Sequence, residues 1–145
     1  MVANFQRHSS AEWKGSLLNG GGTVTTQSSV LDKMQYSFRT RFAKGTGTNP
    51  EELIAAALGG SFSMALSSEL GLLGLVAESI QTTAITTLEN LPLGWTATGI
   101  VLDVHARIPR ATQSNFIAAT LAAKSNCPIA RLLRATVSMT ASLDN

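Results

Sequence analysis

The sequence of 145 residues has little charge, one cysteine and no long uninterrupted apolar run. Charged residues make up only 14%, and the formal net charge is +2 without a basic run, which disfavours a nucleic-acid-binding protein. The single cysteine, Cys127, excludes an intrachain disulfide and a cysteine-based zinc cluster. The longest apolar region, residues 53–75, is interrupted by glycine and serine, and residues 1–10 lack a signal-peptide core. We therefore expect a soluble cytoplasmic protein.

Hydrophobic residues, by contrast, make up 44% of the chain, which is too many for a disordered protein. The length is close to the commonest size of one domain. No internal repeat or linker interrupts it. The sequence therefore predicts a single domain over residues 1–145.

Three strands are predicted in the first third of the chain, over residues 11–18, 23–28 and 35–42. In the third of them aromatic residues alternate with polar ones. We expect this strand to bury its aromatic face and to present Arg39 and Arg41 on the opposite face.

The segment from Asn49 onward predicts a long helix over residues 49–70. Asn49 suits the N-cap, a proline follows it, and Glu52 can close a capping box. Because the helix is apolar almost all round, we expect it to be buried on most sides, more easily at a subunit interface. Gly59 and Gly60 in its middle indicate the close approach of another helix or of a ligand.

The rest of the chain predicts two strands, two helices and a last strand, over residues 76–89, 95–108, 113–123, 126–133 and 135–143. Thr112 suits the cap of the first of these helices. Since the strands follow one another as hairpins, the order predicts an α+β domain, with antiparallel sheets wrapped around the long central buried helix.

Few residues have the chemistry of a catalytic or metal site. Cys127 precedes a proline at a predicted helix start, where free N–H groups and partial positive charge favour a thiolate; it is either a reactive or resolving thiol or a small buried cap residue. Ser61 needs a hydrogen-bond partner inside its apolar helix, and the absence of a nucleophile-elbow motif argues against serine hydrolysis. His105 is expected on a strand face, and two histidines alone make no metal site.

Two charged residues have an ordinary explanation and a functional one. Arg41 is either a solvated strand arginine or a site residue. Glu51 and Glu52 are both favoured at a helix N-terminus, but the capping box explains Glu52 more completely than Glu51.

Several motifs together carry a family resemblance. They are Arg41-Phe42, the run from Gly47 to Ala56, the run from Ser61 to Ser67, and Cys127-Pro128-Ile129. On these motifs the chain resembles the OsmC/Ohr family, named for osmotically inducible protein C and organic hydroperoxide resistance. Trp13-x-Gly15 and the strand beginning at Gly22 are similar to the OsmC branch. The resemblance covers essentially the whole chain.

The resemblance implies a thiol peroxidase that reduces organic hydroperoxides in oxidative and osmotic stress defence. In this family a peroxidatic cysteine attacks the peroxide and becomes a sulfenic acid, a resolving cysteine closes a disulfide, and a dithiol of the lipoyl type restores the enzyme. An arginine held by a glutamate stabilises the thiolate. Matched by motif, the arginine is Arg41, the glutamate is Glu51 and the resolving cysteine is Cys127. The resemblance implies no cofactor or metal, and a cytoplasmic intertwined homodimer.

The chain departs from the family pattern at two places. Ser61 stands ten residues after Glu51, where the peroxidatic cysteine is expected. Because a hydroxyl is a poor nucleophile toward an O–O bond, we expect no normal peroxidase turnover. Ser61 is either an engineered replacement or a natural variant with lost or changed activity. Leu58 and Gly59 stand where a His-Ala pair is more usual, which predicts different packing beside the site.

Three functions stay open at this point. The chain is a peroxidase scaffold disabled at Ser61, a non-catalytic binder of apolar or peroxide-like ligands or a stress-related structural relative, or a redox sensor that uses Cys127 alone.

Helix geometry adds support for the dimer. Ten residues of helix separate Glu51 from Ser61 by about 15 Å, too far for one arginine to bridge easily. Two central helices packed together would bring Glu51 of one subunit beside Ser61 of the other.

Overall fold

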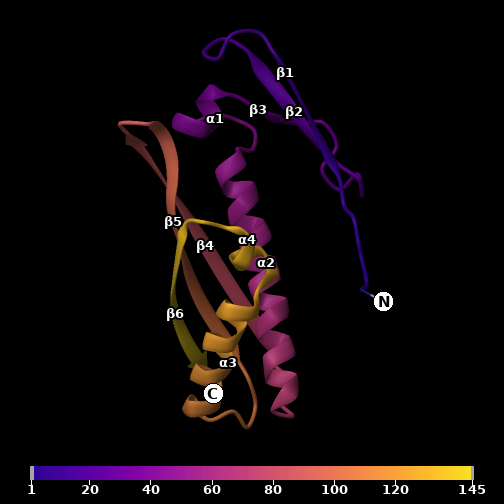
Figure 1. Ribbon diagram of the computed structural model, residues 1–145, viewed down its shortest axis with the longest axis vertical. Coiled ribbons are helices and arrows are strands. Elements are labelled where there is room, and N and C mark those ends of the chain that lie inside the picture. Colours follow the sequence, from indigo (N-terminus) through magenta and orange to yellow (C-terminus); the bar gives the residue numbers. More distant parts are fainter. Residues whose placement is uncertain (1, 145) are drawn as a thin grey trace. The chain divides into compact units, whose positions relative to one another are not determined.

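The computed structural model describes residues 2–144, and the chain divides after Pro50 into two compact units (Figure 1). The first unit has the elements β1 (Ser9–Lys14), β2 (Gly21–Thr26), β3 (Met34–Tyr36) and α1 (Phe38–Phe42). Its strands form an antiparallel sheet in the order β1-β2-β3. The rings of Trp13 and Tyr36 lie 5.5 Å apart, centroid to centroid.

Residues 35–42 were predicted as one strand, and this prediction is wrong in its second half. Strand β3 ends at Tyr36, and α1 follows with Ser37 as its N-cap. The Thr40 N–H donates to Ser37 Oγ at 3.3 Å, while the Ser37 N–H donates to Thr40 Oγ1 at 2.8 Å. This reciprocal capping box overrides the alternating pattern. Arg41 therefore lies in the last turn of a short helix and not on a strand face.

The second unit begins with the long helix α2 (Pro50–Leu72), which confirms the predicted central helix. It continues with β4 (Ser79–Leu91), β5 (Gly94–Arg107), α3 (Gln113–Asn126), α4 (Pro128–Leu132) and β6 (Thr136–Asp144). The strands form a sheet in the order β4-β5-β6. This mixture of two sheets and a long helix confirms the α+β class.

Strand pairing in this sheet differs from the expectation at one place. Strands β4 and β5 pair antiparallel as a hairpin, but β5 and β6 pair parallel. The reason is the connection: α3 and α4 carry the chain back to the end of the sheet where β5 began, which a parallel partner requires.

The hydrophobic core lies in the second unit, where α2, β5 and α3 supply most of its side chains. Along β5 every second residue from Ile100 to Ala106 is buried, as expected for a strand with one face on the core. Leu58, which stands where the family resemblance indicates a histidine, is fully buried in this core. The fully or almost fully buried apolar residues include Leu58, Phe62, Leu66, Leu70, Ile100, Leu102, Val104, Ala106, Ile108 and Phe116.

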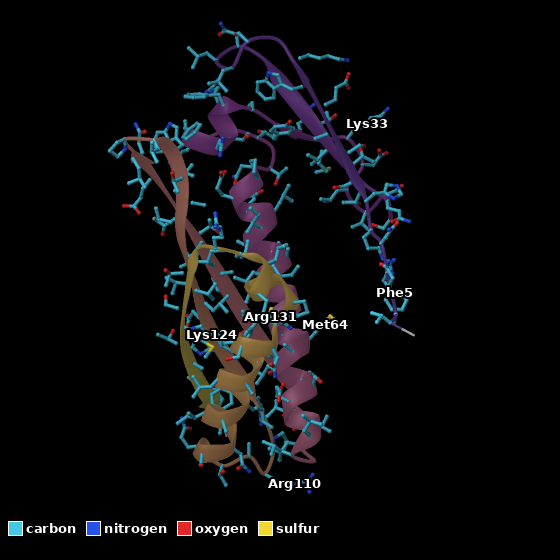
Figure 2. All side chains as sticks on the ribbon, viewed as in Figure 1. Phe5, Lys33, Met64, Arg110, Lys124 and Arg131 are labelled. Carbon is cyan, nitrogen blue, oxygen red and sulfur yellow. The ribbon has the colours of Figure 1, made fainter. Side chains whose placement is uncertain are left out.

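Helix α2 buries one face of its circumference, not most of it. Met64 is 76% exposed in the single chain, and its side chain projects away from the core side of α2 (Figure 2). A Cβ at Gly59 would lie 3.4 Å from the Thr82 carbonyl oxygen, so the close approach at this glycine is to strand β4. A Cβ at Gly60 would meet nothing within 4 Å. Burial of the remaining faces by a second subunit stays a prediction.

By length and composition alone α2 could span a bilayer, since an 18-residue window within it has a mean hydropathy of 1.3. Core helices of water-soluble proteins pass the same test. The buried face of α2 is part of the core described above, which is the arrangement expected of such a helix.

Candidate active site

The structure brings together the two residues that the sequence placed at the peroxidatic and resolving positions. Ser61 lies in the middle of α2, and Cys127 lies between α3 and α4, 66 residues later in the chain. The Cys127 thiol donates a hydrogen bond to Ser61 Oγ, with 3.2 Å between sulfur and oxygen. The hydroxyl inside the apolar helix therefore has a partner from another element.

Local sequence explains why Cys127 sits at a corner. Thr112 caps α3 as predicted, because its side chain accepts a hydrogen bond from the Asn115 N–H at 3.2 Å. Helix α3 then ends at Asn126, and the Cys127 N–H donates to the Ala123 carbonyl at 2.8 Å. A proline follows Cys127 in the first turn of α4. Cys127 is thus the C-cap of one helix and the N-cap of the next.

The thiol of Cys127 is buried, with 0% of the residue exposed, and it belongs to the apolar core cluster. Its side chain makes no capping hydrogen bond to α4. Ser61 is only partly buried. Of the two residues, Ser61 is therefore the more exposed to solvent.

A second hydrogen bond joins the same corner to α2. The Asn126 side-chain amide donates to Glu69 Oε1 at 2.8 Å. Sequence reasoning missed the role of Asn126 and Glu69, because nothing in their spacing signals a contact between residues 57 positions apart.

The two predicted charged residues fall in different units. Arg41, in the first unit, has its guanidinium carbon 5.2 Å from the centroid of the Phe42 ring. Glu51, in the first turn of α2, is partly buried, and its carbonyl accepts a hydrogen bond from Thr86 Oγ1 at 3.3 Å. The predicted pairing of Arg41 with Glu51, and the capping box between Asn49 and Glu52, stay predictions.

His105 lies on the exposed face of β5, as expected. It contacts Ser142 through Nδ1 at 2.6 Å and Asp103 through Nε2 at 3.3 Å, and Thr140 donates to the other Asp103 oxygen at 3.0 Å. The His105 and Asp103 side chains are about half exposed. This open position suits cross-strand bonding of β5 to β6. Within residues 2–144 no three His, Cys, Asp or Glu side chains gather as a metal site would need.

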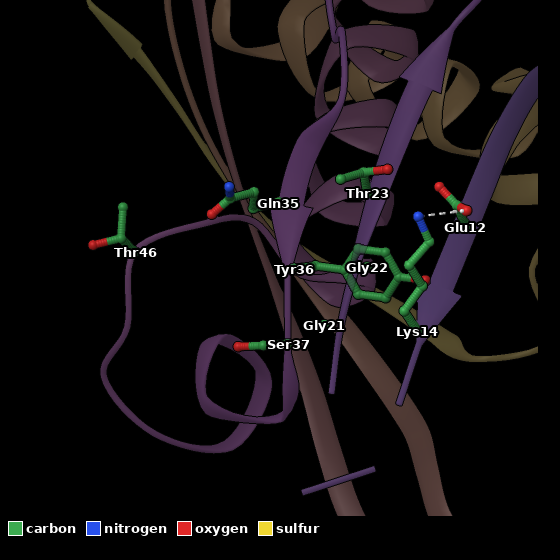
Figure 3. Close-up of a pocket in the computed structure, with 9 residues that line it drawn as sticks. All are labelled: Glu12, Lys14, Gly21, Gly22, Thr23, Gln35, Tyr36, Ser37 and Thr46. Atoms are coloured by element: carbon green, nitrogen blue, oxygen red, sulfur yellow. Dashed lines mark ion pairs between the residues drawn. The ribbon is translucent and has the colours of Figure 1, made fainter. Parts of the chain in front are cut away.

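Two hollows of the molecule lie away from this pair. One, of about 460 Å³, runs between α2 and β4 and is lined by Gly59, Gly60 and Ser63 among others, but not by Ser61. The other, of about 310 Å³, lies in the first unit, where an ion pair of 3.1 Å joins Lys14 to Glu12 (Figure 3). Neither is lined by a predicted site residue, so the Ser61–Cys127 pair remains the candidate site.

Comparison with known proteins shows which family the chain resembles. The model of the OsmC-like protein family matches residues 43–142. Peroxiredoxin OsmC of Escherichia coli is 42% identical over 129 residues, which cover 89% of this chain and 90% of that protein.

Solved structures agree with the fold. An OsmC-like protein of unknown function from Vibrio cholerae superimposes with a TM-score of 0.79 at 17% identity, covering 96% of this chain and 100% of that one. An organic hydroperoxide resistance protein OsmC from Legionella pneumophila gives a TM-score of 0.69 at 24% identity, covering 99% and 100%. From the family match, the relative from E. coli and the shared fold, we conclude that this chain belongs to the OsmC family.

Proposed function

We propose that the chain is an OsmC-type peroxidase scaffold for organic hydroperoxides in oxidative and osmotic stress defence, and that Ser61 stops its catalytic cycle. The observation that carries the proposal is the 3.2 Å contact between Ser61 Oγ and Cys127 Sγ. The similar protein from E. coli is a peroxiredoxin, that is, a thiol-dependent peroxidase. The similarity extends over almost its whole length. The proposal assigns position 61 to the attacking thiol and Cys127 to the resolving thiol.

The chemistry requires sulfur at position 61. A thiolate there would attack the distal peroxide oxygen and the O–O bond would break, so that the sulfur becomes a sulfenic acid. The alkoxide would take up the proton that the thiol had released and leave as the alcohol. The Cys127 thiol would then attack that sulfur, forming the S–S bond and releasing water. Because an S–S bond is about 2.05 Å long, a starting contact of 3.2 Å needs only a small movement. Serine cannot take the first step.

The remaining parts of the proposal follow the family resemblance. Arg41, held by Glu51, is assigned to stabilising the thiolate against the desolvation that an apolar helix imposes. We assign each active site to residues of two subunits, and the reduction of its disulfide to a dithiol of the lipoyl type. The location assigned to the protein is the cytoplasm. The exposed apolar side chain of Met64 on α2 supports a second subunit there. We also propose that the two units act together as one domain.

Burial distinguishes the main proposal from the redox-sensor alternative. Redox-sensing cysteines are accessible to solvent, whereas Cys127 is 0% exposed. A sensor that uses Cys127 alone is therefore disfavoured. The binder alternative is an outcome of the experiment below.

The deciding experiment is Ser61→Cys, with Ser63→Cys as matched control. Ser63 lies two residues along the same helix, but its hydroxyl contacts Thr82 Oγ1 of β4 at 2.8 Å and not Cys127. We expect Ser61→Cys to consume cumene hydroperoxide with a dithiol reductant, faster than hydrogen peroxide, and to form a disulfide with Cys127. The parent chain and Ser63→Cys should do neither. If the Ser61→Cys protein is folded and dimeric but stays inert and forms no disulfide, the peroxidase proposal is wrong. A non-catalytic binder of apolar or peroxide-like ligands then takes its place.

A further inference from the structure

Among the described residues, two adjacent residues of the α3–α4 corner each donate a side-chain hydrogen bond to α2. The Cys127 thiol donates to Ser61, and the Asn126 amide donates to Glu69. The second bond is the shorter at 2.8 Å, and its acceptor is a carboxylate. Hydrogen bonds to charged acceptors are about twice as strong as neutral ones, and a thiol is a weak donor. The amide–carboxylate bond is exposed to solvent, which weakens it, whereas the thiol–hydroxyl bond is partly buried.

The two bonds reach different turns of α2. Glu69 follows Ser61 by eight residues, which is about 12 Å along a helix. Asn126 and Cys127 are adjacent, so the corner is attached to α2 at two separated points. One attachment leaves the corner free to pivot about it, whereas two fix its direction. Core packing also holds the fully buried Cys127, and the Asn126–Glu69 bond adds a second attachment to α2 that bears on where the Cys127 side chain points.

The backbone at the corner does not fix that direction by itself. The Cys127 N–H and carbonyl bond only to residues of α3 and α4, at 2.8 Å to Ala123 and 3.0 Å to Arg131. These bonds keep the corner intact but do not connect it to α2. The Cys127 side chain makes no capping bond that would hold it within the corner.

We propose that Asn126 and Glu69 are positioning residues: their hydrogen bond is a latch that keeps the Cys127 thiol buried and directed at position 61. For disulfide closure this rests on the function proposed above. For the burial of Cys127 it does not, since the thiol is 0% exposed in the chain as it stands. The two consequences can be measured separately.

The first test uses the unaltered Ser61 chain and the rate at which Cys127 reacts with 5,5′-dithiobis(2-nitrobenzoate). A buried thiol reacts only when its surroundings open. Asn126→Ala should raise the rate about two- to tenfold, as expected for the loss of one solvent-exposed hydrogen bond. Asn126→Asp should raise it further, because two carboxylates then face each other. The control Ser125→Ala, at the exposed residue next to Asn126, should leave the rate unchanged.

An exchange of donor and acceptor separates positioning from general loss of stability. In the double variant Glu69→Gln/Asn126→Asp the amide and the carboxylate change sides, so one amide–carboxylate bond can form again. We expect its labelling rate to return to within about threefold of the parent, while Asn126→Asp alone stays fast. If Asn126→Asp labels at the parent rate, or if the exchange gives no rescue, the latch is wrong.

The second test adds Ser61→Cys and separates the two chemical steps. Asn126→Asp should slow closure of the disulfide by diamide about tenfold, and the exchange should restore it. Sulfenic acid formation with cumene hydroperoxide should stay unchanged, because the latch acts on Cys127. Closure by diamide without any reaction with peroxide would refute the proposed function and leave the latch supported. If the disulfide closes equally fast in Ser61→Cys and in Ser61→Cys/Asn126→Asp, the latch is refuted.

Discussion

The two compact units differ in how much apolar surface they bury. The second unit holds a core in which Phe62, Leu66 and Phe116 are fully buried. Among the described residues of the first unit, only Thr40 is buried. Its large apolar side chains, such as Phe5 and Val30, are mostly exposed.

This difference shows that the two units have different sources of stability. Fifty residues rarely bury enough apolar surface to be stable alone. Backbone pairing, a capping box and a few aromatic contacts hold the sheet of the first unit, whereas a packed core holds the second. We infer that the first unit needs a further apolar surface, from its own chain or from a second copy.

The largest effect is expected from one phenylalanine in each unit. Phe62→Ala removes a fully buried ring and should lower the free energy of unfolding by about 3–5 kcal/mol. Phe5→Ala removes a ring that is 80% exposed and should change it by less than about 0.5 kcal/mol. Urea denaturation followed by circular dichroism measures both. A loss above 2 kcal/mol for Phe5→Ala would mean that the Phe5 ring is buried in solution.

A charge on the exposed face of α2 tests burial by a second copy. Met64→Glu should weaken a dimer by about 2 kcal/mol or more, since a carboxylate would be buried without a partner. Leu93→Glu, in the exposed turn between β4 and β5, is the control and should have no effect. Analytical ultracentrifugation measures both. A parent chain that sediments as a monomer at micromolar concentration would contradict the dimer.

Two adjacent glycines of β2 test how tightly the first unit packs. A Cβ at Gly22 would lie 2.5 Å from the Glu12 carbonyl oxygen and 2.6 Å from the Tyr36 ring. Gly22→Ala should therefore destabilise by about 1–3 kcal/mol. At Gly21 the nearest atom is the Tyr36 carbonyl oxygen, 3.9 Å away, so Gly21→Ala should be close to neutral. Similar melting temperatures for the two variants would show that the sheet yields easily.

The smallest effect on stability is expected from the predicted Arg41–Glu51 pair. If the pair is exposed to solvent, as Arg41 is, Arg41→Ala and Glu51→Ala should each cost no more than about 1 kcal/mol, because exposed ion pairs contribute little. Both should weaken binding of an anionic probe such as benzoate near Ser61, measured by calorimetry. Arg39→Ala, an exposed arginine of the same short helix, is the control. A loss of several kcal/mol would instead identify a buried structural pair.

Most elements of the second unit could be predicted because their signals are local. The proline after Asn49 predicted the start of α2, Thr112 predicted the start of α3, and alternation predicted β6 over nearly its full length. In the first unit the alternation of residues 35–42 was misleading, since a capping box at Ser37 competed with it. Both signals are local, and the pattern alone could not rank them.

The candidate site was predictable only in part. Ser61 and Cys127 were identified by motif, and the structure places their side chains in contact. The latch residues Asn126 and Glu69 carry no motif, so only the fold revealed them. The roles of Arg41 and Glu51 stay predictions.

The sequence by itself determined the helices of the second unit, the alternating faces of β6 and the thiol-to-hydroxyl change at position 61, because periodicity, caps and residue chemistry are properties of neighbouring residues. The tertiary structure decided which elements meet. It paired β5 with β6 in parallel, exposed one face of α2, and brought the α3–α4 corner to Ser61 and Glu69. Such choices depend on packing between segments far apart in the chain, where many partners are compatible with the same local pattern.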